Sequence, residues 1–187
     1  MKSNPFIGVE EILTKLEITR SSIDRLHASA QAGVYAIFLK NGDRLPIDTI
    51  PKNGLVYIGM SKNLAAREYD MHFCTGKSGF STLRRTIGAL KKEELNLVAI
   101  PRSKGGSQSN VRNFSFDLNG EERLTRWMRD NLEVGICPLD KGNEEAEKNI
   151  ISELKPMLCL RGWPNPLTPY IKNLRKKCAE EAKLSRK

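Results

Sequence analysis

The sequence has few of the features that mark membrane-spanning, exported, disulfide-rich or zinc-binding proteins. No run of about 18 apolar residues occurs, so no transmembrane helix and no membrane partner are predicted. The N-terminal stretch MKSNPFIGVEEIL has no apolar signal core and soon becomes acidic, and we therefore expect a cytoplasmic protein. The 4 cysteines lack CxxC spacing and there are 2 histidines, which predicts free thiols rather than a disulfide framework or a zinc site.

Several common catalytic motifs are also missing. The stretch GMSK that begins at Gly59 lacks the GxxxxGK[ST] spacing of a P-loop, and there is no GxGxxG, GxSxG or HExxH. The length of 187 residues suits one sizeable core, and we expect a single domain over residues 1–187. A hydrophobic content of 39% and a charged content of 28% are typical of a soluble globular protein.

The net charge of +9 is unevenly distributed along the chain. Residues 1–75 carry 9 basic and 8 acidic side chains, residues 76–130 carry 11 and 6, residues 131–154 carry 2 and 6, and residues 155–187 carry 9 and 2. A basic chain with one acidic segment is typical of a protein that binds a polyanion and also holds a cation. From charge alone, a soluble protein that happens to be basic is an equally good interpretation.

The spacing of apolar residues predicts an α/β chain. Core strands are expected at 33–40, 55–60 and 132–137, where short β-branched and aromatic runs occur. Helical spacing at 9–16 and 23–26 indicates two short helices that form a lid on the sheet, with a helix-turn-helix as the alternative. Further helices are predicted to begin near Ser61 or Asn63, at Ser81, at Asn119 with Glu122 as a capping-box partner, at Glu145 and at Thr168.

Residues 76–130 are interpreted as a basic block inserted into the core. The helix that begins at Ser81 should turn its apolar side chains inward and leave Arg84 and Arg85 on other faces. A Gly/Ser-rich basic stretch later in the block is predicted to be a mobile loop. The two strands predicted on either side of this loop are 97–100 and 113–118.

Several polar side chains are predicted to face the core. Tyr35 and Tyr57 lie on the first two strands, and Arg67 lies between Leu64 and Met71 on the inward face of its helix. A salt-bridged surface arginine would more naturally lie on the opposite side. Arg67 is therefore either part of a buried ion pair or a site residue.

Glu147 supplies a carboxylate to the same set. It precedes Ile150, Ile151 and Leu154 at helical spacing, so it lies on the apolar face of its own helix. Burying a carboxylate without a partner is costly, and we expect a cation, a metal or a strong donor beside it. A purely structural ion pair with Arg67 is the alternative interpretation.

These residue types are sufficient for phosphodiester hydrolysis. A single glutamate with water ligands suits Mg²⁺, and arginine presents a planar fork to phosphate oxygens. A tyrosine hydroxyl can orient or deprotonate an attacking water. The set therefore predicts a site that handles a phosphate.

Two parts of the sequence resemble the GIY-YIG nuclease family. The first consists of GVY at 33–35, YIG at 57–59 and the string SKNLAAR that ends at Arg67. The second is E-x-x-I-I-x-x-x-x-P, from Glu147 to Pro156, which looks like the metal-binding helix of the family. The resemblance covers residues 33–72 and 132–160. It implies a small core with a three-stranded antiparallel sheet flanked by helices, and cleavage of DNA by a one-metal route.

The resemblance also implies roles for individual residues. Tyr35 would be the general base, Tyr57 its orienting partner, Arg67 the residue that stabilises the pentavalent phosphate, and Glu147 the ligand of Mg²⁺ or Mn²⁺. Some restriction-type members use a histidine soon after the arginine, which makes His72 a catalytic candidate. Its spacing of five residues turns it away from Arg67 on a regular helix.

The sequence departs from the family at two positions. Met60 stands where many members have a lysine straight after YIG, although Lys62 is close. Cys159 stands where many members have an asparagine after the proline that ends the metal-binding helix. Asn165, in the WPNP turn, is a candidate substitute for that asparagine.

We therefore expect a Mg²⁺-dependent endonuclease that acts on double-stranded DNA and is restriction-like. A repair or mobile-element nuclease and a non-catalytic nucleic-acid-binding protein with the same fold are the alternatives. Cutting of both strands by one metal centre would favour a homodimer. The predicted DNA contacts are Lys62, Arg84, Arg85, Arg102, Lys104, Arg112, Arg123, Arg126, Asn165, Lys172, Arg175 and Lys176.

Overall fold

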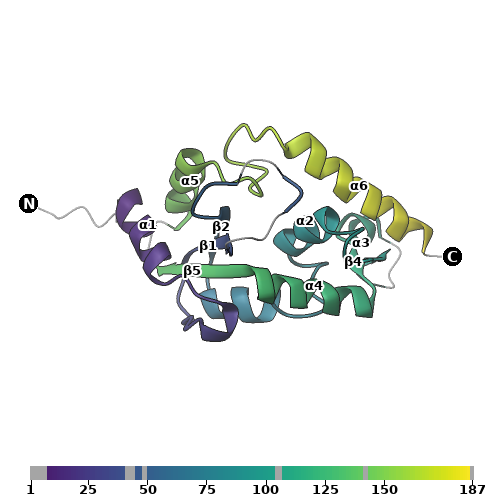
Figure 1. Ribbon diagram of the computed structural model, residues 1–187, viewed down its shortest axis with the longest axis horizontal. Coiled ribbons are helices and arrows are strands. Elements are labelled where there is room, and N and C mark those ends of the chain that lie inside the picture. The colour runs from purple at the N-terminus through teal and green to yellow at the C-terminus, as the bar shows by residue number, and fades with distance from the viewer. Residues whose placement is uncertain (1–7, 41–44, 48–49, 104–106, 141–142, 186–187) are drawn as a thin grey trace, which may run out of the picture. The chain divides into compact units, whose positions relative to one another are not determined.

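The three predicted core strands form one antiparallel sheet. The computed structural model describes residues 8–40, 45–47, 50–103, 107–140 and 143–185. In it, β1 (Gly33–Leu39) pairs on one side with β2 (Leu55–Ser61) and on the other with β5 (Leu132–Pro138) (Figure 1). The predicted α+β class, with a three-stranded antiparallel sheet flanked by helices, is confirmed.

The central strand is buried along its whole length. Tyr35 lies opposite Gly59 on β2 and opposite Ile136 on β5. Side chains two residues apart on a strand point to the same face, so Tyr57 shares a face with Gly59 and is a diagonal neighbour of Tyr35. The register thus places the two predicted catalytic tyrosines together.

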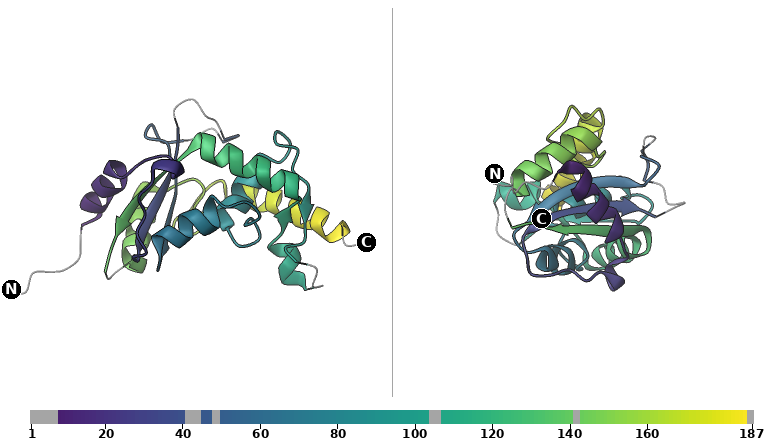
Figure 2. Two further views of the ribbon diagram at one scale, coloured as in Figure 1. Left: turned by 90° about the horizontal axis from the view of Figure 1, so that it is seen from below. Right: turned by 90° about the vertical axis from the view of Figure 1, so that its left-hand side faces the viewer.

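Two helices pack on this sheet. Helix α1 (Val9–Ile18) packs against β5, and α5 (Asn143–Leu154) packs against β2 and β1 (Figure 2). The apolar residues of both helices join one hydrophobic cluster with residues of β1 and β2. The second predicted N-terminal helix is a single 3₁₀ turn, η1 (Ile23–Arg25). Because a helix-turn-helix needs two full helices, the described residues favour the other interpretation, a lid that packs on the sheet.

The chain folds into two compact units. Within the described ranges, the sheet unit comprises residues 8–40, 50–68, 132–140 and 143–165, and the helical unit comprises residues 45–47, 69–103, 107–131 and 166–185. In the helical unit, α6 packs against α2, α3 and β3, while α4 packs against β4. Its elements are α2 (Thr82–Leu90), β3 (Ala99–Ile100), α3 (Gln108–Arg112), β4 (Ser115–Phe116), α4 (Leu118–Asn131) and α6 (Thr168–Leu184).

Two local predictions in the inserted block are wrong. The stretch predicted to be a loop contains helix α3, which the Ser107 hydroxyl caps by accepting a hydrogen bond from the Asn110 amide at 3.3 Å. Helix α4 begins at Leu118, before the predicted cap at Asn119. The first turn of α4 contains Glu121, whose Oε1 accepts a hydrogen bond from the Phe116 amide at 3.1 Å.

The segment that carries Arg67 is also not the regular helix that its spacing predicts. The side chain of Asn63 accepts a hydrogen bond from the Ala66 amide at 2.9 Å, as expected of a cap. From there the chain forms a π-helix, η2 (Ala66–His72). Backbone bonds in a π-helix join residues five apart, and such segments are frequent at functional sites.

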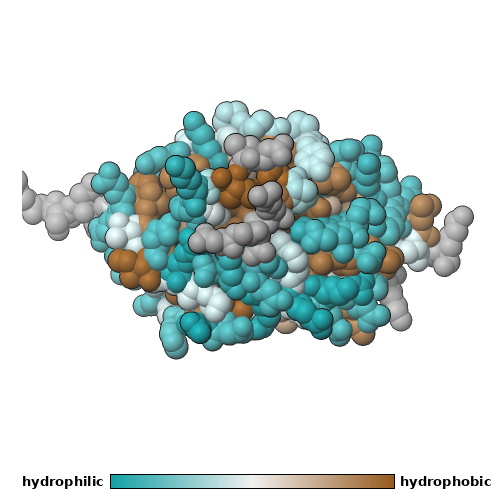
Figure 3. Space-filling model, in the orientation of Figure 1, coloured by the Kyte–Doolittle hydropathy of each residue, from teal (hydrophilic) through white to brown (hydrophobic). Residues whose placement is uncertain are grey.

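The face drawn in Figure 3 is mostly hydrophilic, with small hydrophobic areas between the charged side chains. Among the described residues, no helix combines the length and the apolar character that a membrane-spanning helix requires.

Candidate active site

Tyr35 occupies the centre of the candidate site because the residue opposite it has no side chain. A Cβ at Gly59 would lie 2.3 Å from the hydroxyl oxygen and 2.5 Å from Cζ of Tyr35. The tyrosine can therefore cross β2 only if position 59 is glycine. The ring of Tyr57 lies 6.1 Å from that of Tyr35, with an angle of 32° between the ring planes.

Arg67 is held against the hydroxyl of Tyr35. Its Nε donates a hydrogen bond to the Tyr35 oxygen at 3.2 Å, and its guanidinium carbon lies 6.0 Å from the centre of the tyrosine ring. Its two Nη groups make no hydrogen bond with the described residues, and the side chain is partly exposed. The planar fork of Arg67 is therefore available to an incoming anion.

The surroundings keep both tyrosines protonated. Burial raises the pKa of Tyr35 well above its usual value, and the nearby hydroxyl of Tyr57 adds to the increase, whereas Arg67 opposes it. Burial likewise raises the pKa of Tyr57 to about 12, although Arg67 and a hydrogen bond with Tyr35 oppose the shift. Without an additional cation, these phenols orient a water molecule better than they deprotonate it.

Glu147 reaches the same site from helix α5. Its half-buried carboxylate accepts a hydrogen bond from the backbone amide of Met60, directly after Gly59. Burial raises the pKa of Glu147, and the Met60 hydrogen bond and the charge of Arg67 counteract this. Among the described residues, Arg67 and Glu147 interact electrostatically but do not form an ion pair. The described contacts therefore do not support a purely structural Arg67–Glu147 pair.

The donor set around Glu147 suits a hydrated divalent ion. The described side chains form no group of three or more His, Cys, Asp or Glu that could hold a metal. Mg²⁺ binds through one or two carboxylates and keeps several of its waters, whereas a structural zinc site needs about four protein ligands. A half-buried carboxylate whose charge acts on Tyr57 and Arg67 therefore fits Mg²⁺ or Mn²⁺.

A second carboxylate, Glu68, was missed by the sequence reasoning. Its side chain is fully buried, and neither carboxylate oxygen has a hydrogen-bond partner among the described residues. Burial raises the pKa of Glu68 to about 8, and Arg67 opposes the shift. Its charge also acts on Tyr35. No signal in the sequence marks it, because it follows Arg67 directly and an α-helix would turn it away from the inward face.

The candidate histidine lies in the helical unit. The side chain of His72 is buried, and its Nδ1 lies 2.8 Å from the hydroxyl of Ser81, the residue that caps α2. Because η2 is a π-helix, residues five apart lie closer to one face than they would on an α-helix. The five-residue spacing therefore separates His72 from the face of Arg67 less than it would on a regular α-helix. A catalytic role for His72 stays a prediction.

Asn165 and Cys159 both hold the loop that follows α5. The amide nitrogen of Asn165 donates to the carbonyls of Met157 at 2.8 Å and Cys159 at 3.0 Å. The thiol of Cys159 lies 3.3 Å from both the amide and the carbonyl of Ile58 on β2. These contacts give Asn165 a loop-holding role, and its predicted contact with DNA stays untested.

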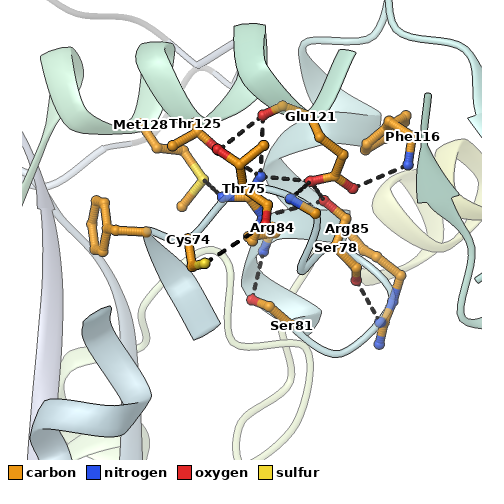
Figure 4. A network of polar contacts seen from close by, with 12 residues as sticks. Cys74, Thr75, Ser78, Ser81, Arg84, Arg85, Phe116, Glu121, Thr125 and Met128 are labelled. Carbon is orange, nitrogen blue, oxygen red and sulfur yellow. Dashed lines mark hydrogen bonds and ion pairs between the residues drawn. The ribbon is translucent and has the colours of Figure 1, made fainter. Parts of the chain in front are cut away.

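The prediction that Arg84 and Arg85 lie on outward faces is wrong. Arg84 is fully buried, and its Nη2 lies 2.7 Å from the carboxylate of Glu121 (Figure 4). Its other nitrogens donate to the His72 carbonyl at 3.0 Å and the Ser78 hydroxyl at 3.3 Å. The burial of Arg84 was missed because Glu121, its partner, lies 37 residues away in the sequence.

The remaining predicted DNA contacts differ in their surroundings. Arg123 donates to the carbonyls of Leu95 and Asn96, both at 2.7 Å, and so holds the turn after α2. Arg102 and Arg175 are partly buried, and Lys104 lies outside the described residues. The exposed side chains of this set, for which a role in binding stays a prediction, are Lys62, Arg112, Arg126, Lys172 and Lys176.

Comparison with known proteins adds one match. The family model described as the GIY-YIG catalytic domain matches residues 33–178, which is most of the chain. No curated protein and no solved structure matches the chain significantly. The match contains Tyr35, Tyr57, Arg67 and Glu147.

Proposed function

Because the chain belongs to the GIY-YIG family, and is thus a nuclease of that type that hydrolyses phosphodiester bonds, we propose that it is a metal-dependent endonuclease for double-stranded DNA. The observation that carries this proposal is the hydrogen bond from Arg67 to Tyr35, together with the electrostatic interaction between Arg67 and the carboxylate of Glu147. These groups come from three separate elements of the sheet unit. A phosphate at this point would meet a cationic fork, two hydroxyls and a carboxylate.

Arg67 binds the phosphate in this proposal. Only its Nε has a hydrogen-bond partner among the described residues, so both Nη groups can donate to the two non-bridging oxygens of a phosphodiester. Negative charge builds up on these oxygens as the water attacks. A fixed donor at that place lowers the barrier more than it strengthens binding of the ground state.

Tyr35 positions the attacking water and, once its own proton has passed to solvent, accepts the proton of that water as the phenolate. The hydrogen bond from Arg67 to the Tyr35 oxygen lowers the pKa of this hydroxyl, against the effect of burial. Tyr57, which is hydrogen-bonded to Tyr35, fixes the direction of that oxygen. Glu147 would hold Mg²⁺ or Mn²⁺, which supplies a Lewis acid for phosphate oxygens and lowers the pKa of nearby hydroxyls and water.

Double-stranded DNA is the substrate that the charge of the chain favours. The helical unit contains most of the inserted block, where basic side chains outnumber acidic ones, and the C-terminal helix adds Lys172 and Lys176. The block would act as a target-recognition element, which favours a restriction-like enzyme over a repair enzyme. Cutting both strands with one centre per chain would require two protomers or two successive cuts.

The proposal is tested with supercoiled plasmid DNA and three proteins: wild type, Tyr35→Phe and Tyr170→Phe. Wild type and Tyr170→Phe, which loses an exposed hydroxyl outside the site, should nick or linearise the plasmid with Mg²⁺ or Mn²⁺ and not with a chelator. Tyr35→Phe should be at least about 100-fold slower, because it lacks the proton acceptor. If wild type binds the plasmid without cutting it under all metals, the chain is a binding protein that has kept the nuclease fold.

A further inference from the structure

Two arginines of the helical unit contact the turn formed by Ser78, Gly79 and Phe80, and the charge of a third, Arg175, acts on one of them. Arg85 projects from α2, and its Nη1 donates to the Ser78 carbonyl at 2.8 Å (Figure 4). Arg102 follows β3, and its guanidinium carbon lies 5.1 Å from the centre of the Phe80 ring. The two side chains thus approach one short turn from different elements.

Gly79 allows this close approach. A Cβ at position 79 would lie 2.4 Å from Cγ of Arg102, so the aliphatic part of the arginine rests directly on the glycine backbone. The guanidinium of Arg102 is oriented further by the side-chain oxygen of Asn110, 3.2 Å from Nη2. The position of Arg102 is therefore built by three contacts that involve no opposite charge.

Arg85 is buried without a carboxylate partner. It is 5% exposed, and besides the Ser78 carbonyl its guanidinium donates, among the residues that the structure describes, only to the Thr82 hydroxyl, at 3.3 Å. Its Nε has no hydrogen-bond partner among the described residues. Burying a cation in this way is costly unless an anion or further acceptors compensate.

The third arginine, Arg175, comes from α6, which packs against α2, α3 and β3. Burial lowers the pKa of Arg85 to about 10, and the positive charges of Arg175 and Arg102 lower it further. The charges of Arg102 and Arg175 thus both act unfavourably on Arg85, and an anionic oxygen ligand beside Arg85 and Arg102 would offset this repulsion. Arginine clusters are the usual protein partner for phosphate groups.

We propose that Arg85, Arg102 and Arg175 form a phosphate-binding site in the helical unit that takes a backbone phosphate of the DNA substrate. The proposal rests on the proposed function for the identity of the ligand. The site differs from the scissile-phosphate position at Arg67, because all its members belong to the helical unit. Arg84, the neighbour of Arg85, is not part of it, since Glu121 already neutralises Arg84.

The first test measures the site without DNA. The free energy of unfolding in urea is compared in inorganic phosphate and in chloride at equal ionic strength, for wild type, Arg102→Gln and Arg129→Gln. Phosphate should stabilise wild type and Arg129→Gln, an exposed arginine of the same unit, and should stabilise Arg102→Gln less, because a ligand stabilises only the form that binds it. Equal stabilisation of all three proteins would overturn the proposal.

The second test measures binding of a DNA duplex against salt concentration by fluorescence anisotropy, in a Glu147→Gln background that does not cut. Arg102→Gln should weaken binding about tenfold and lower the slope of log K against log salt by about 0.9, the value of one released counterion contact. Arg129→Gln should change neither quantity. Arg85→Gln, if folded, should match Arg102→Gln. A binding curve for Arg102→Gln equal to that of Arg129→Gln would contradict the proposal.

The two tests separate this proposal from the proposed nuclease activity. Stabilisation by phosphate and a reduced salt slope require no cleavage, so they can succeed even if the plasmid is never cut. Conversely, an Arg102→Gln variant that cleaves the plasmid and binds DNA with unchanged affinity would support the nuclease function and contradict the proposed phosphate-binding site.

Discussion

Two arginine–carboxylate systems, one in each unit, differ in how completely their hydrogen bonds are satisfied. In the helical unit, every guanidinium nitrogen of Arg84 has a partner, and Glu121 accepts from Phe116, Gly76 and Ser78 as well as from Arg84. In the sheet unit, Arg67 uses only Nε, and the neighbouring Glu68 has no hydrogen-bond partner among the described residues.

The difference separates a structural network from a site. A buried network whose hydrogen bonds are all formed has no free donor or acceptor for a ligand, and it fixes the packing of the elements that contribute to it. An incomplete network is costly to keep in a folded protein, and such sites are often where substrate or ions complete the missing contacts.

The largest effect is expected from Glu121→Gln. The substitution leaves Arg84 as a buried charge without a counterion, which typically costs about 3–5 kcal/mol of folding stability. Chemical denaturation of the variant and of Glu122→Gln, its exposed neighbour, measures the effect. A stability equal to that of Glu122→Gln would mean that the Arg84–Glu121 network does not hold the helical unit together.

A smaller effect on catalysis is expected from Arg67→Lys. Lysine keeps the charge but loses the planar fork and the hydrogen bond from Nε to Tyr35, so cleavage should slow about 10²- to 10³-fold. Folding stability should change by less than about 1 kcal/mol, because Arg67 is partly exposed and its side chain makes a single hydrogen bond with the described residues. A cleavage rate of Arg67→Lys near that of wild type would show that Arg67 does not stabilise the phosphate during the reaction.

Glu68→Gln should change the dependence of stability on pH. The pKa of Glu68 rises from its ordinary value of 4.5 to about 8 in the folded chain. Between these values the folded state keeps a proton that the unfolded state has lost, so this group makes stability fall as pH rises, by about 1.4 kcal/mol per pH unit. Glutamine should abolish that contribution.

Denaturation at several pH values checks this, with Asp70→Asn as the control, since Asp70 is exposed on the same π-helix. The control should keep the wild-type slope. A Glu68→Gln variant with that same slope would show that Glu68 ionises normally in the folded protein.

Much of the sheet unit could be predicted from local patterns. The strands follow from short apolar runs, and Tyr35, Tyr57 and Glu147 follow from strand alternation and helical spacing. These patterns involve residues close together in the chain, so a single sequence is enough to detect them. The π-helix could not be predicted, because its hydrogen-bond pattern has no distinct apolar period, and with it Glu68 was missed.

The helical unit was less accessible to the same reasoning. In the sequence, the positions of Arg84 and Arg85 are typical of the solvent-exposed face of a helix. Their burial depends on contacts with Glu121 and with the turn at Ser78. Strands β3 and β4 do lie within the predicted strands at 97–100 and 113–118, but each is only two residues long. Burial of charge is a tertiary property, and a single helix pattern does not contain it.

The most direct test of the account measures two quantities on one variant, Glu147→Gln, with Glu145→Gln as the exposed control on the same helix. We predict that Glu147→Gln cuts duplex DNA at least about 100-fold more slowly, because the metal ligand is lost, while its free energy of unfolding stays within about 1 kcal/mol of wild type. Normal cleavage, or a loss of stability large enough to explain the loss of activity, would contradict the assignment of this site.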